Sequence, residues 1–221
     1  MISAWQRGLY AIADLQSIGA ADLTVRVGAA IDGGAVLVQY RDKTGDAAQR
    51  GARARALLSC CRARNVPLVI NDDVALAAAV GADGVHLGRD DTTVAMARQQ
   101  LGPRAIIGVS CYNQLSRAVA AAEAGANYVA FGRFFPSRTK PHAVQAEPDV
   151  LVRAKRCLNI PLVAIGGITA ENGAALVAAG ADLLAVIHGV FGQTDIKAAA
   201  RSIAAIFAGQ TPNHRRTVLS V

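Results

Sequence analysis

Short runs of apolar and β-branched residues alternate along this chain with longer segments of helical periodicity. Strands of a parallel sheet that is covered on both faces are apolar throughout, without alternation of apolar and polar positions. We predict strands of this kind at Leu9–Asp14, Val36–Arg41, Leu68–Asn71, Gly84–Leu87, Ile106–Ser110, Tyr128–Gly132, Leu162–Gly166 and Leu184–His188.

The segments between these runs are mostly apolar on one side and charged on the other, which is typical of helices that cover a sheet. We predict helices at Asp22–Gly33, Asp46–Arg64, Asp73–Val80, Thr92–Leu101, Gln114–Ala124, Glu147–Leu158, Ala170–Ala179 and Asp195–Ala208. Three helix-to-strand connections, in segments 77–88, 121–132 and 175–187, share Gly-Ala followed by Asp or Asn. This repeat indicates a tight turn that leads into the N-terminal end of the next strand.

Eight strand–helix units in 221 residues favour an α/β fold, a single (β/α)8 TIM barrel over residues 1–208. The periodicity is lost after this point, so we expect residues 209–221 to form a mobile C-terminal tail. An open doubly wound sheet is the competing architecture. Its dinucleotide-binding version is disfavoured, because no G-x-G-x-x-G motif opens the first predicted helix.

Composition agrees with this fold class, since 52% of the residues are hydrophobic but only 5% are aromatic. Charged or amide residues interrupt every apolar run before it reaches the roughly 18 residues of a membrane span. The first residues, MISAWQRGLY, lead into a strand without a signal-peptide core, so we expect a cytoplasmic protein without membrane partners. The four cysteines lack the spacing of a zinc site or a disulfide framework.

A net charge of +7 raises the question of a nucleic-acid partner. Five arginines that contribute to this charge fall along one predicted helix: Arg50, Arg53, Arg55, Arg62 and Arg64. No aromatic residues are interleaved with them, which favours a solvated outer face over a nucleic-acid surface. We therefore predict no nucleic-acid partner and interpret the excess charge as suited to phosphorylated small molecules. The oligomeric state stays open.

The C-terminal ends of the strands are where active sites of (β/α)8 barrels lie. With a period of two, Gln39 and Arg41 of the second strand point into the barrel and Lys43 follows at the rim. A buried arginine needs an anionic partner, since leaving its charge unpaired costs several kcal/mol. The partner is either a bound anion or an inward carboxylate such as Asp72.

One carboxylate at each of two neighbouring strand ends suggests a divalent metal site. Asp72 ends the third strand, and Asp91 follows the fourth. Mg²⁺ binds through few protein carboxylates together with substrate oxygens, and we predict these two residues as its ligands. Helix capping is the alternative role for Asp73, Asp90 and Asp91.

Anion-binding groups gather at the remaining strand ends. Ser110 ends the fifth strand, and the loop Phe131–Lys140 after the sixth presents two hydroxyls and a lysine. Bare backbone N–H groups can approach an anion at Gly166–Gly167 after the seventh strand, and the loops after the seventh and eighth strands often form a phosphate site in such barrels. We predict two anion sites beside the metal. No Ser-His-Asp set or Cys-His pair is present, which argues for charge stabilisation of a leaving group without a covalent enzyme intermediate.

Taken together, these strand ends resemble the thiamine phosphate synthase family, over nearly the whole chain up to the tail. The motifs that carry the resemblance are Q-Y-R-D-K at Gln39–Lys43, N-D at Asn71–Asp72, G-V-H-L-G-x-x-D ending at Asp91, G-V-S ending at Ser110, F-F-P-S-x-T-K ending at Lys140, and G-G-I at Gly166–Ile168. The resemblance implies Mg²⁺-dependent joining of 4-amino-2-methyl-5-hydroxymethylpyrimidine diphosphate to 4-methyl-5-(2-phosphoethyl)thiazole, with release of diphosphate.

The resemblance also implies a role for each site residue. Gln39 reads the aminopyrimidine, and Asp72 and Asp91 hold Mg²⁺. The diphosphate is held by Arg41, Lys43, Asn71, Ser110 and Lys140, and all of these except Asn71 are candidate catalytic residues. The thiazole phosphate is held by Ser137, Thr139 and the backbone of Gly167, Ile187 and His188. Tyr40, Asp42 and Arg138 lie in the same motifs and are included as candidate substrate-binding residues.

Three residues depart from the pattern of the family. Ser137 stands where Thr is frequent, Arg89 where Gln is frequent, and His188 where Ser is frequent. The last change keeps the backbone donor but puts any hydroxyl contact in doubt. The alternative function is that of a relative resembling the thiazole tautomerases, which binds thiazole phosphate without transferase activity. Such a relative should lack the diphosphate and metal residues, and they are present here.

Overall fold

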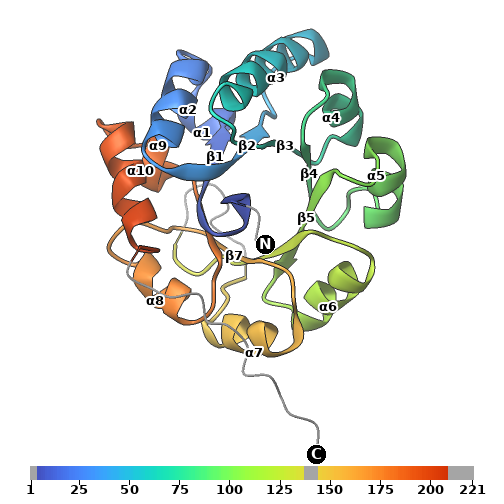
Figure 1. The fold of residues 1–221 in the computed structure, drawn as a ribbon, viewed down its shortest axis with the longest axis vertical. Coiled ribbons are helices and arrows are strands. Elements are labelled where there is room, and N and C mark those ends of the chain that lie inside the picture. Colours follow the sequence, from blue (N-terminus) through green and yellow to red (C-terminus); the bar gives the residue numbers. More distant parts are fainter. Residues whose placement is uncertain (1–3, 137–143, 209–221) are drawn as a thin grey trace, which may run out of the picture.

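Eight parallel strands close into one barrel in the computed structural model, which describes residues 4–136 and 144–208. Each strand pairs with the next along the chain, and the last pairs with the first (Figure 1). The strands are β1 (Gly8–Asp14), β2 (Ala35–Arg41), β3 (Leu68–Asn71), β4 (Gly84–Leu87), β5 (Ile106–Tyr112), β6 (Tyr128–Phe131), β7 (Leu162–Ile165) and β8 (Leu183–Val186). The predicted α/β TIM barrel is confirmed.

Helices cover the outside of the barrel, as Figure 1 shows. They are α1 (Leu15–Ile18), α2 (Leu23–Asp32), α3 (Ala47–Arg62), α4 (Val74–Val80), α5 (Val94–Leu101), α6 (Leu115–Glu123), α7 (Asp149–Cys157), α8 (Gly173–Ala178), α9 (His188–Phe191) and α10 (Ile196–Ala205). Within the described ranges, no helix is long and apolar enough to cross a membrane. The predicted tail lies outside the described residues.

The short helices α1 and α9 were not predicted, because four residues are too few to show a helical period. Helix α1 follows β1 directly, and α9 begins one residue after β8. The prediction that the eighth strand extends to His188 was wrong, since β8 ends at Val186 and His188 is the first residue of α9. Backbone N–H groups of a helix start therefore replace strand backbone at this edge of the barrel.

The core has two layers, one outside the sheet and one inside it. Leu57 and Leu151 are among the fully buried residues that pack helices against the strands. Tyr10, Leu37 and Tyr128 belong to a separate cluster in the barrel interior. A short 3₁₀ helix, η1 (Ala4–Gln6), lies over the centre of the barrel in Figure 1, and its Trp5 packs edge-on against Tyr128. The N-terminal end of the barrel is therefore filled.

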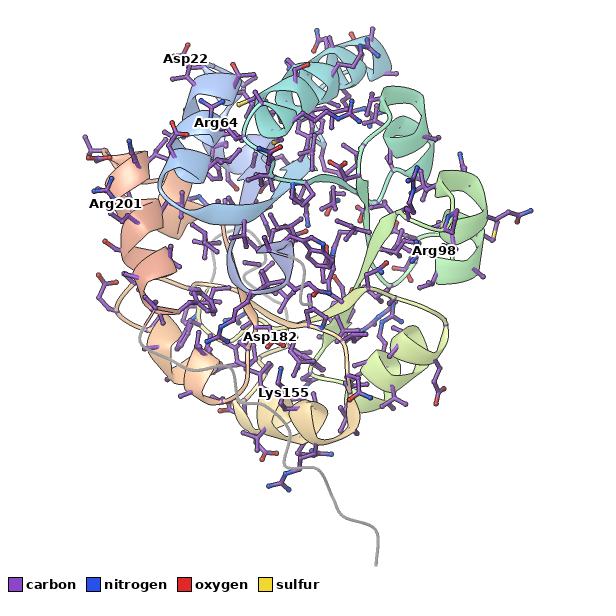
Figure 2. The ribbon with its side chains drawn as sticks, viewed as in Figure 1. Asp22, Arg64, Arg98, Lys155, Asp182 and Arg201 are labelled. Atoms are coloured by element: carbon purple, nitrogen blue, oxygen red, sulfur yellow. The ribbon has the colours of Figure 1, made fainter. Side chains whose placement is uncertain are left out.

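The shared Gly-Ala-Asp/Asn turns have a common hydrogen-bond pattern at this end of the barrel. Asp83, Asn127 and Asp182 each accept a bond of 2.8–2.9 Å from the backbone N–H at the start of the preceding strand. Each also donates its own backbone N–H back to that strand. Lys155 bonds both carboxylate oxygens of Asp182 at 2.7 Å, and both residues are labelled in Figure 2. These turns fix the register of three strand pairs.

Candidate active site

A cavity of about 590 Å³ occupies the C-terminal end of the barrel. This volume is within the usual range for small-molecule sites. The predicted site residues that line it are Gln39, Arg41, Lys43, Asn71, Asp72, Ser110, Gly167, Ile187 and His188. The predicted residues Ser137, Arg138, Thr139 and Lys140 lie outside the described residues. The barrel therefore brings together residues that the sequence places on five different strand ends.

Solvent exposure increases along the end of β2, from the floor of the cavity to its rim. Gln39 is 3% exposed, the side chain of Arg41 is 16% exposed, and that of Lys43 is 47% exposed. Alternate residues of a strand share one face, which is why these three line one wall. An uncharged amide is therefore at the bottom of the wall and a cation is at the top.

Tyr40 and Asp42, predicted to bind substrate, do not line this cavity. Their parity along β2 turns them toward α3, where the Tyr40 hydroxyl donates to Asp42 at 2.8 Å. Asp42 also accepts bonds from Arg53 and Thr44. Burial raises the pKa of Asp42, but the bonds from Thr44, Tyr40 and Arg53 outweigh it and hold that pKa well below its usual range. The two residues brace the loop that carries Lys43.

Arg41 is paired with a carboxylate that sequence reasoning missed. Its Nη1 donates to Oδ1 of Asp14 at 2.5 Å, and Asp14 is fully buried. Ser17 Oγ donates to the other oxygen of Asp14 at 2.7 Å. The sequence suggested Asp72 as a structural partner of Arg41, but the structure pairs Arg41 with Asp14 instead. Asp14 lies on the same face of β1 as the interior residue Tyr10, so the alternation along this strand could have identified it as a residue that points into the barrel.

Asp72 instead accepts a hydrogen bond of 2.8 Å from Lys43. Its φ of 63° is in the left-handed region, which Asp tolerates better than most residues. Its carboxylate is adjacent to that of Asp91, whose Oδ2 accepts from the Gly88 N–H at 2.6 Å. A Cβ at Gly88 would lie 2.8 Å from Asp91 Oδ2, so a larger residue there would displace this carboxylate from its present position.

The pKa values of the two carboxylates are shifted in opposite directions. Burial raises the pKa of Asp72, but the bond from Lys43 and the contact with Asp91 outweigh it and leave this pKa lowered. Burial and the neighbouring Asp72 raise the pKa of Asp91. A cation would relieve the repulsion between two ionised groups at this spot.

Asp73, for which capping was the alternative, does cap α4 by accepting from Leu76 N.

The donor set at Asp72 and Asp91 fits a hard divalent cation with few protein ligands. Within residues 4–136 and 144–208, no group of three or more His, Cys, Asp and Glu side chains is placed to hold a metal. Such a cation would therefore need oxygens from water or a substrate, which is the usual coordination of Mg²⁺.

A chain of buried hydrogen bonds crosses the floor of the cavity. Gln39 Nε2 donates to the Tyr10 hydroxyl at 2.5 Å, and this hydroxyl lies 2.8 Å from that of Tyr128. The Tyr128 hydroxyl lies 2.9 Å from His86 Nδ1, and His86 Nε2 lies 2.9 Å from Ser110 Oγ. Sequence reasoning missed Tyr10, His86 and Tyr128 as site residues. Their inward parity in three predicted strands was the signal that could have found them.

Arg117 of α6 holds the ends of two strands from behind the cavity wall. Its Nε donates to the carbonyl of Ser110 at 2.8 Å, and its Nη2 donates to the carbonyl of Gly88 at 3.0 Å. Arg89, which departs from the family pattern, stacks over the ring of Tyr112 with its guanidinium carbon 4.6 Å from the centroid. These contacts connect the Ser110 end of the site with the loop that carries Asp91.

Backbone groups form the opposite wall, after β7 and β8. Gly166 and Gly167 have φ values of 105° and 64°, a conformation that favours glycine. A Cβ at Gly167 would lie 2.3 Å from the carbonyl oxygen of Pro136, so the described start of the loop after β6 packs against this turn. Asn172 supports the turn by donating to the Gly167 carbonyl at 3.0 Å. The wall offers backbone N–H groups, which suit a phosphate.

Comparisons with known proteins place the chain in a family. The family model described as thiamine monophosphate synthase matches residues 9–190. A thiamine-phosphate synthase of Nitrosococcus oceani is 53% identical over 194 residues, covering 88% of this chain and 89% of that protein. One from Marinobacter nauticus is 52% identical over 207 residues and covers 93% of each chain.

A solved structure shows the same likeness. The thiamine phosphate pyrophosphorylase from Pyrococcus furiosus superposes with a TM-score of 0.82 at 31% identity, over 93% of this chain and 97% of that one. The match of the family model spans all eight strands except the first residue of β1. The chain belongs to the thiamine monophosphate synthase family.

Proposed function

We propose that this protein is a thiamine-phosphate synthase, which joins 4-amino-2-methyl-5-hydroxymethylpyrimidine diphosphate to 4-methyl-5-(2-phosphoethyl)thiazole and releases diphosphate. Its family membership makes it an enzyme of the transferase class, and relatives that bear this name are about half identical to it. The observation that carries the proposal is the arrangement of the cavity. A buried amide at its floor, cations on one wall and backbone donors on the other provide for two phosphorylated substrates.

The pyrimidine diphosphate fits the β2–β5 side of the cavity. Its ring would reach Gln39 at the floor, and its diphosphate would extend upward toward Arg41, Lys43, Asn71 and Ser110. Arg41 is oriented by Asp14, and Lys43 by Asp72. Cations fixed in advance near the leaving diphosphate stabilise the negative charge that develops as its bond to the methylene carbon breaks.

The thiazole phosphate fits the opposite wall, against the backbone of Gly167, Ile187 and His188. This position leaves its ring nitrogen facing the methylene carbon of the pyrimidine, for attack as the diphosphate leaves. Ile12, Val163 and Ala185 line the space between the walls and keep it apolar. An apolar lining disfavours water as a competing nucleophile and strengthens the electrostatic interactions inside.

Mg²⁺ is the proposed cofactor, held by Asp72 and Asp91. When bound, it would neutralise charge on the diphosphate as a Lewis acid. Lys43 has a second role here, because its bond to Asp72 keeps that carboxylate ionised. Lys140, Ser137 and Thr139 remain candidate ligands of the diphosphate and the thiazole phosphate on the strength of the family pattern.

The experiment that tests the function is incubation with both substrates and Mg²⁺, scoring thiamine phosphate and diphosphate together. Controls omit each substrate in turn. Equal amounts of the two products, formed only in the complete mixture, are the expected result. If thiazole phosphate binds but no thiamine phosphate forms, the tautomerase-like alternative replaces the proposal.

A nucleic-acid function has less support, because arginines of α3 and of the turn after it are bonded within the chain. Arg53 pairs with Asp42, Arg64 pairs with Asp32, and Arg62 donates to the Gly81 carbonyl. Binding to nucleic acid at low salt that weakens steeply as salt is added would favour that function.

A further inference from the structure

The buried chain of hydrogen bonds at the cavity floor has a direction, and this direction can be worked out by following its protons. The Gln39 amide donates to the Tyr10 hydroxyl through Nε2. Burial raises the pKa of both Tyr10 and Tyr128, so each hydroxyl keeps its proton at neutral pH. Each tyrosine therefore has a single proton to donate.

Either tyrosine hydroxyl could donate to the other, and the roles at His86 depend on its tautomer, so we assign the later bonds by continuing from the first one. Tyr10 already accepts from Gln39, and the neighbour to which its own proton can go is the Tyr128 hydroxyl, at 2.8 Å. Tyr128 then donates to His86 Nδ1, at 2.9 Å. A neutral imidazole that accepts at Nδ1 carries its proton on Nε2, and so donates to Ser110 Oγ. The hydroxyl proton of Ser110 is left to point into the cavity, which Ser110 lines.

We infer that the chain Gln39–Tyr10–Tyr128–His86–Ser110 sets opposite hydrogen-bonding characters at the two ends of the pyrimidine diphosphate site and makes the site specific for an amino group at one end and an anion at the other. Gln39 presents Oε1 as an acceptor, and Ser110 presents O–H as a donor. The inference rests on the proposed function, because the amino group and the diphosphate belong to one substrate.

If every hydrogen bond in the chain pointed the other way, Ser110 would lose its ability to donate to the diphosphate. A ligand with a carbonyl in place of the amino group would require the Gln39 amide to turn, so that Oε1 accepts from Tyr10. Tyr128 would then donate to Tyr10, and His86 would donate from Nδ1 and accept at Nε2. Ser110 would have to give its proton to His86 and could no longer donate to the diphosphate. A ligand with the carbonyl ring would thus bind its diphosphate more weakly.

The packing around the chain keeps its members in place. The rings of His86 and Tyr128 are nearly parallel with centroids 5.6 Å apart, and the rings of Tyr10 and Tyr128 meet edge to face. Gly108 makes room for Tyr128, since a Cβ there would lie 1.9 Å from Cζ and 2.3 Å from the hydroxyl oxygen. The members come from five different strands, so the chain is a property of the closed barrel.

The first test is the tautomer of His86 in the protein without ligands, from ¹⁵N NMR at neutral pH. The difference between the spectra of wild type and His86→Gln assigns the signals of His86. We expect a pyridine-like Nδ1 and a pyrrole-like Nε2. Tyr128→Phe removes the donor to Nδ1 and should change this pattern, while Tyr40→Phe, which removes a buried hydroxyl outside the chain, should not. The opposite tautomer, or a doubly protonated ring, would overturn the inference.

The second test compares the amino substrate with the analogue that carries a carbonyl at the same ring position. The ratio of kcat/KM values should favour the amino compound in the wild type and fall about tenfold in Tyr128→Phe, the effect of one hydrogen bond. Tyr10→Phe breaks the chain one link earlier and should shift the ratio in the same direction. Thermal melting followed by circular dichroism shows whether each variant folds. If one of the two does not fold, the ratio measured in the other variant tests the inference.

The outcomes separate this inference from the proposed function. If the protein makes thiamine phosphate but both variants keep the wild-type ratio, the coupling is refuted and the synthase function stands. If no product forms, the ratio is measured as binding of the two diphosphates by calorimetry. The tautomer of His86 is read without any substrate, so failure of the function leaves that test in force.

Discussion

Arg41 and Asp14, at the ends of the adjacent strands β2 and β1, form a hydrogen bond of 2.5 Å in which the carboxylate is fully buried. The pair orients the one guanidinium that the β2 wall presents to the cavity. Because both groups are charged and shielded from water, removing either one leaves the other without its partner in a low-dielectric site.

Asp14→Asn should therefore impair binding of the pyrimidine diphosphate without reshaping the cavity. The amide keeps the volume but loses the charge that holds Arg41, so we expect KM for this substrate to rise about tenfold and the free energy of unfolding to fall by about 3 kcal/mol. Steady-state kinetics and urea unfolding check the two effects. Ser17→Ala, which removes only a neutral donor to Asp14, is the matched control and should change both quantities less.

The lowered pKa of Asp42 predicts that the stability of the folded protein falls at acid pH. Its pKa is held below the ordinary 3.8 in the folded protein. A lowered folded pKa means that the stabilisation is present above about pH 4 and is lost as the pH falls through the folded value. Asp42→Asn should be less stable than the wild type at pH 7, and the difference should shrink below about pH 4. Melting temperatures of both proteins across this range give the measurement, and a difference that stays constant would contradict the prediction.

Asp72 connects Lys43 with the proposed metal site. Replacing it with Asn should lower Mg²⁺-dependent turnover at least a hundredfold, roughly the loss of a charged ligand, while the melting temperature changes by only a few degrees. The side chain is partly exposed, which limits the stability cost. Turnover is measured as a function of Mg²⁺ concentration. Loss of activity and stability in equal proportion would instead mark an ion pair that serves only the fold.

Arg117 provides a test of positioning from outside the cavity. Arg117→Lys keeps the charge but cannot reach both the Ser110 and Gly88 carbonyls with a rigid fork. We expect kcat/KM for the pyrimidine diphosphate to fall about tenfold while KM for the thiazole changes little. Arg98→Lys, which affects a similar clamp on carbonyls at the N-terminal end of the barrel, is the control and should leave both constants nearly unchanged. The same loss in both variants would mean that only general stability is involved.

The sequence predicts the barrel well because a strand buried on both faces leaves a local signal in the chain. Parity along β2 placed Gln39, Arg41 and Lys43 correctly on the cavity wall. Parity alone should also have turned Tyr40 and Asp42 away from it. We predicted that these two residues bind substrate because they lie in the Q-Y-R-D-K motif. In the structure, Tyr40 instead donates to Asp42, and Asp42 also accepts from Arg53.

The remaining contacts of the site depend on register between strands, which a single sequence does not reveal. Arg41 could meet an acidic side chain on either neighbouring strand, and only the pairing of Asp14 with Arg41 across β1 and β2 decides for one. The Tyr10 and Tyr128 hydroxyls are 118 positions apart in the chain. No local pattern predicts such a contact, because it exists only when the barrel closes.

The 3₁₀ helix η1 has a kinetic consequence. Among the described residues, Trp5 and the interior cluster occupy the N-terminal end of the barrel, so a ligand reaches Gln39 from the C-terminal end. We therefore expect the molecule that contacts Gln39 to enter before one that binds nearer the rim, and to leave after that molecule or joined to it. The closed floor of the barrel thus favours one order of binding and release.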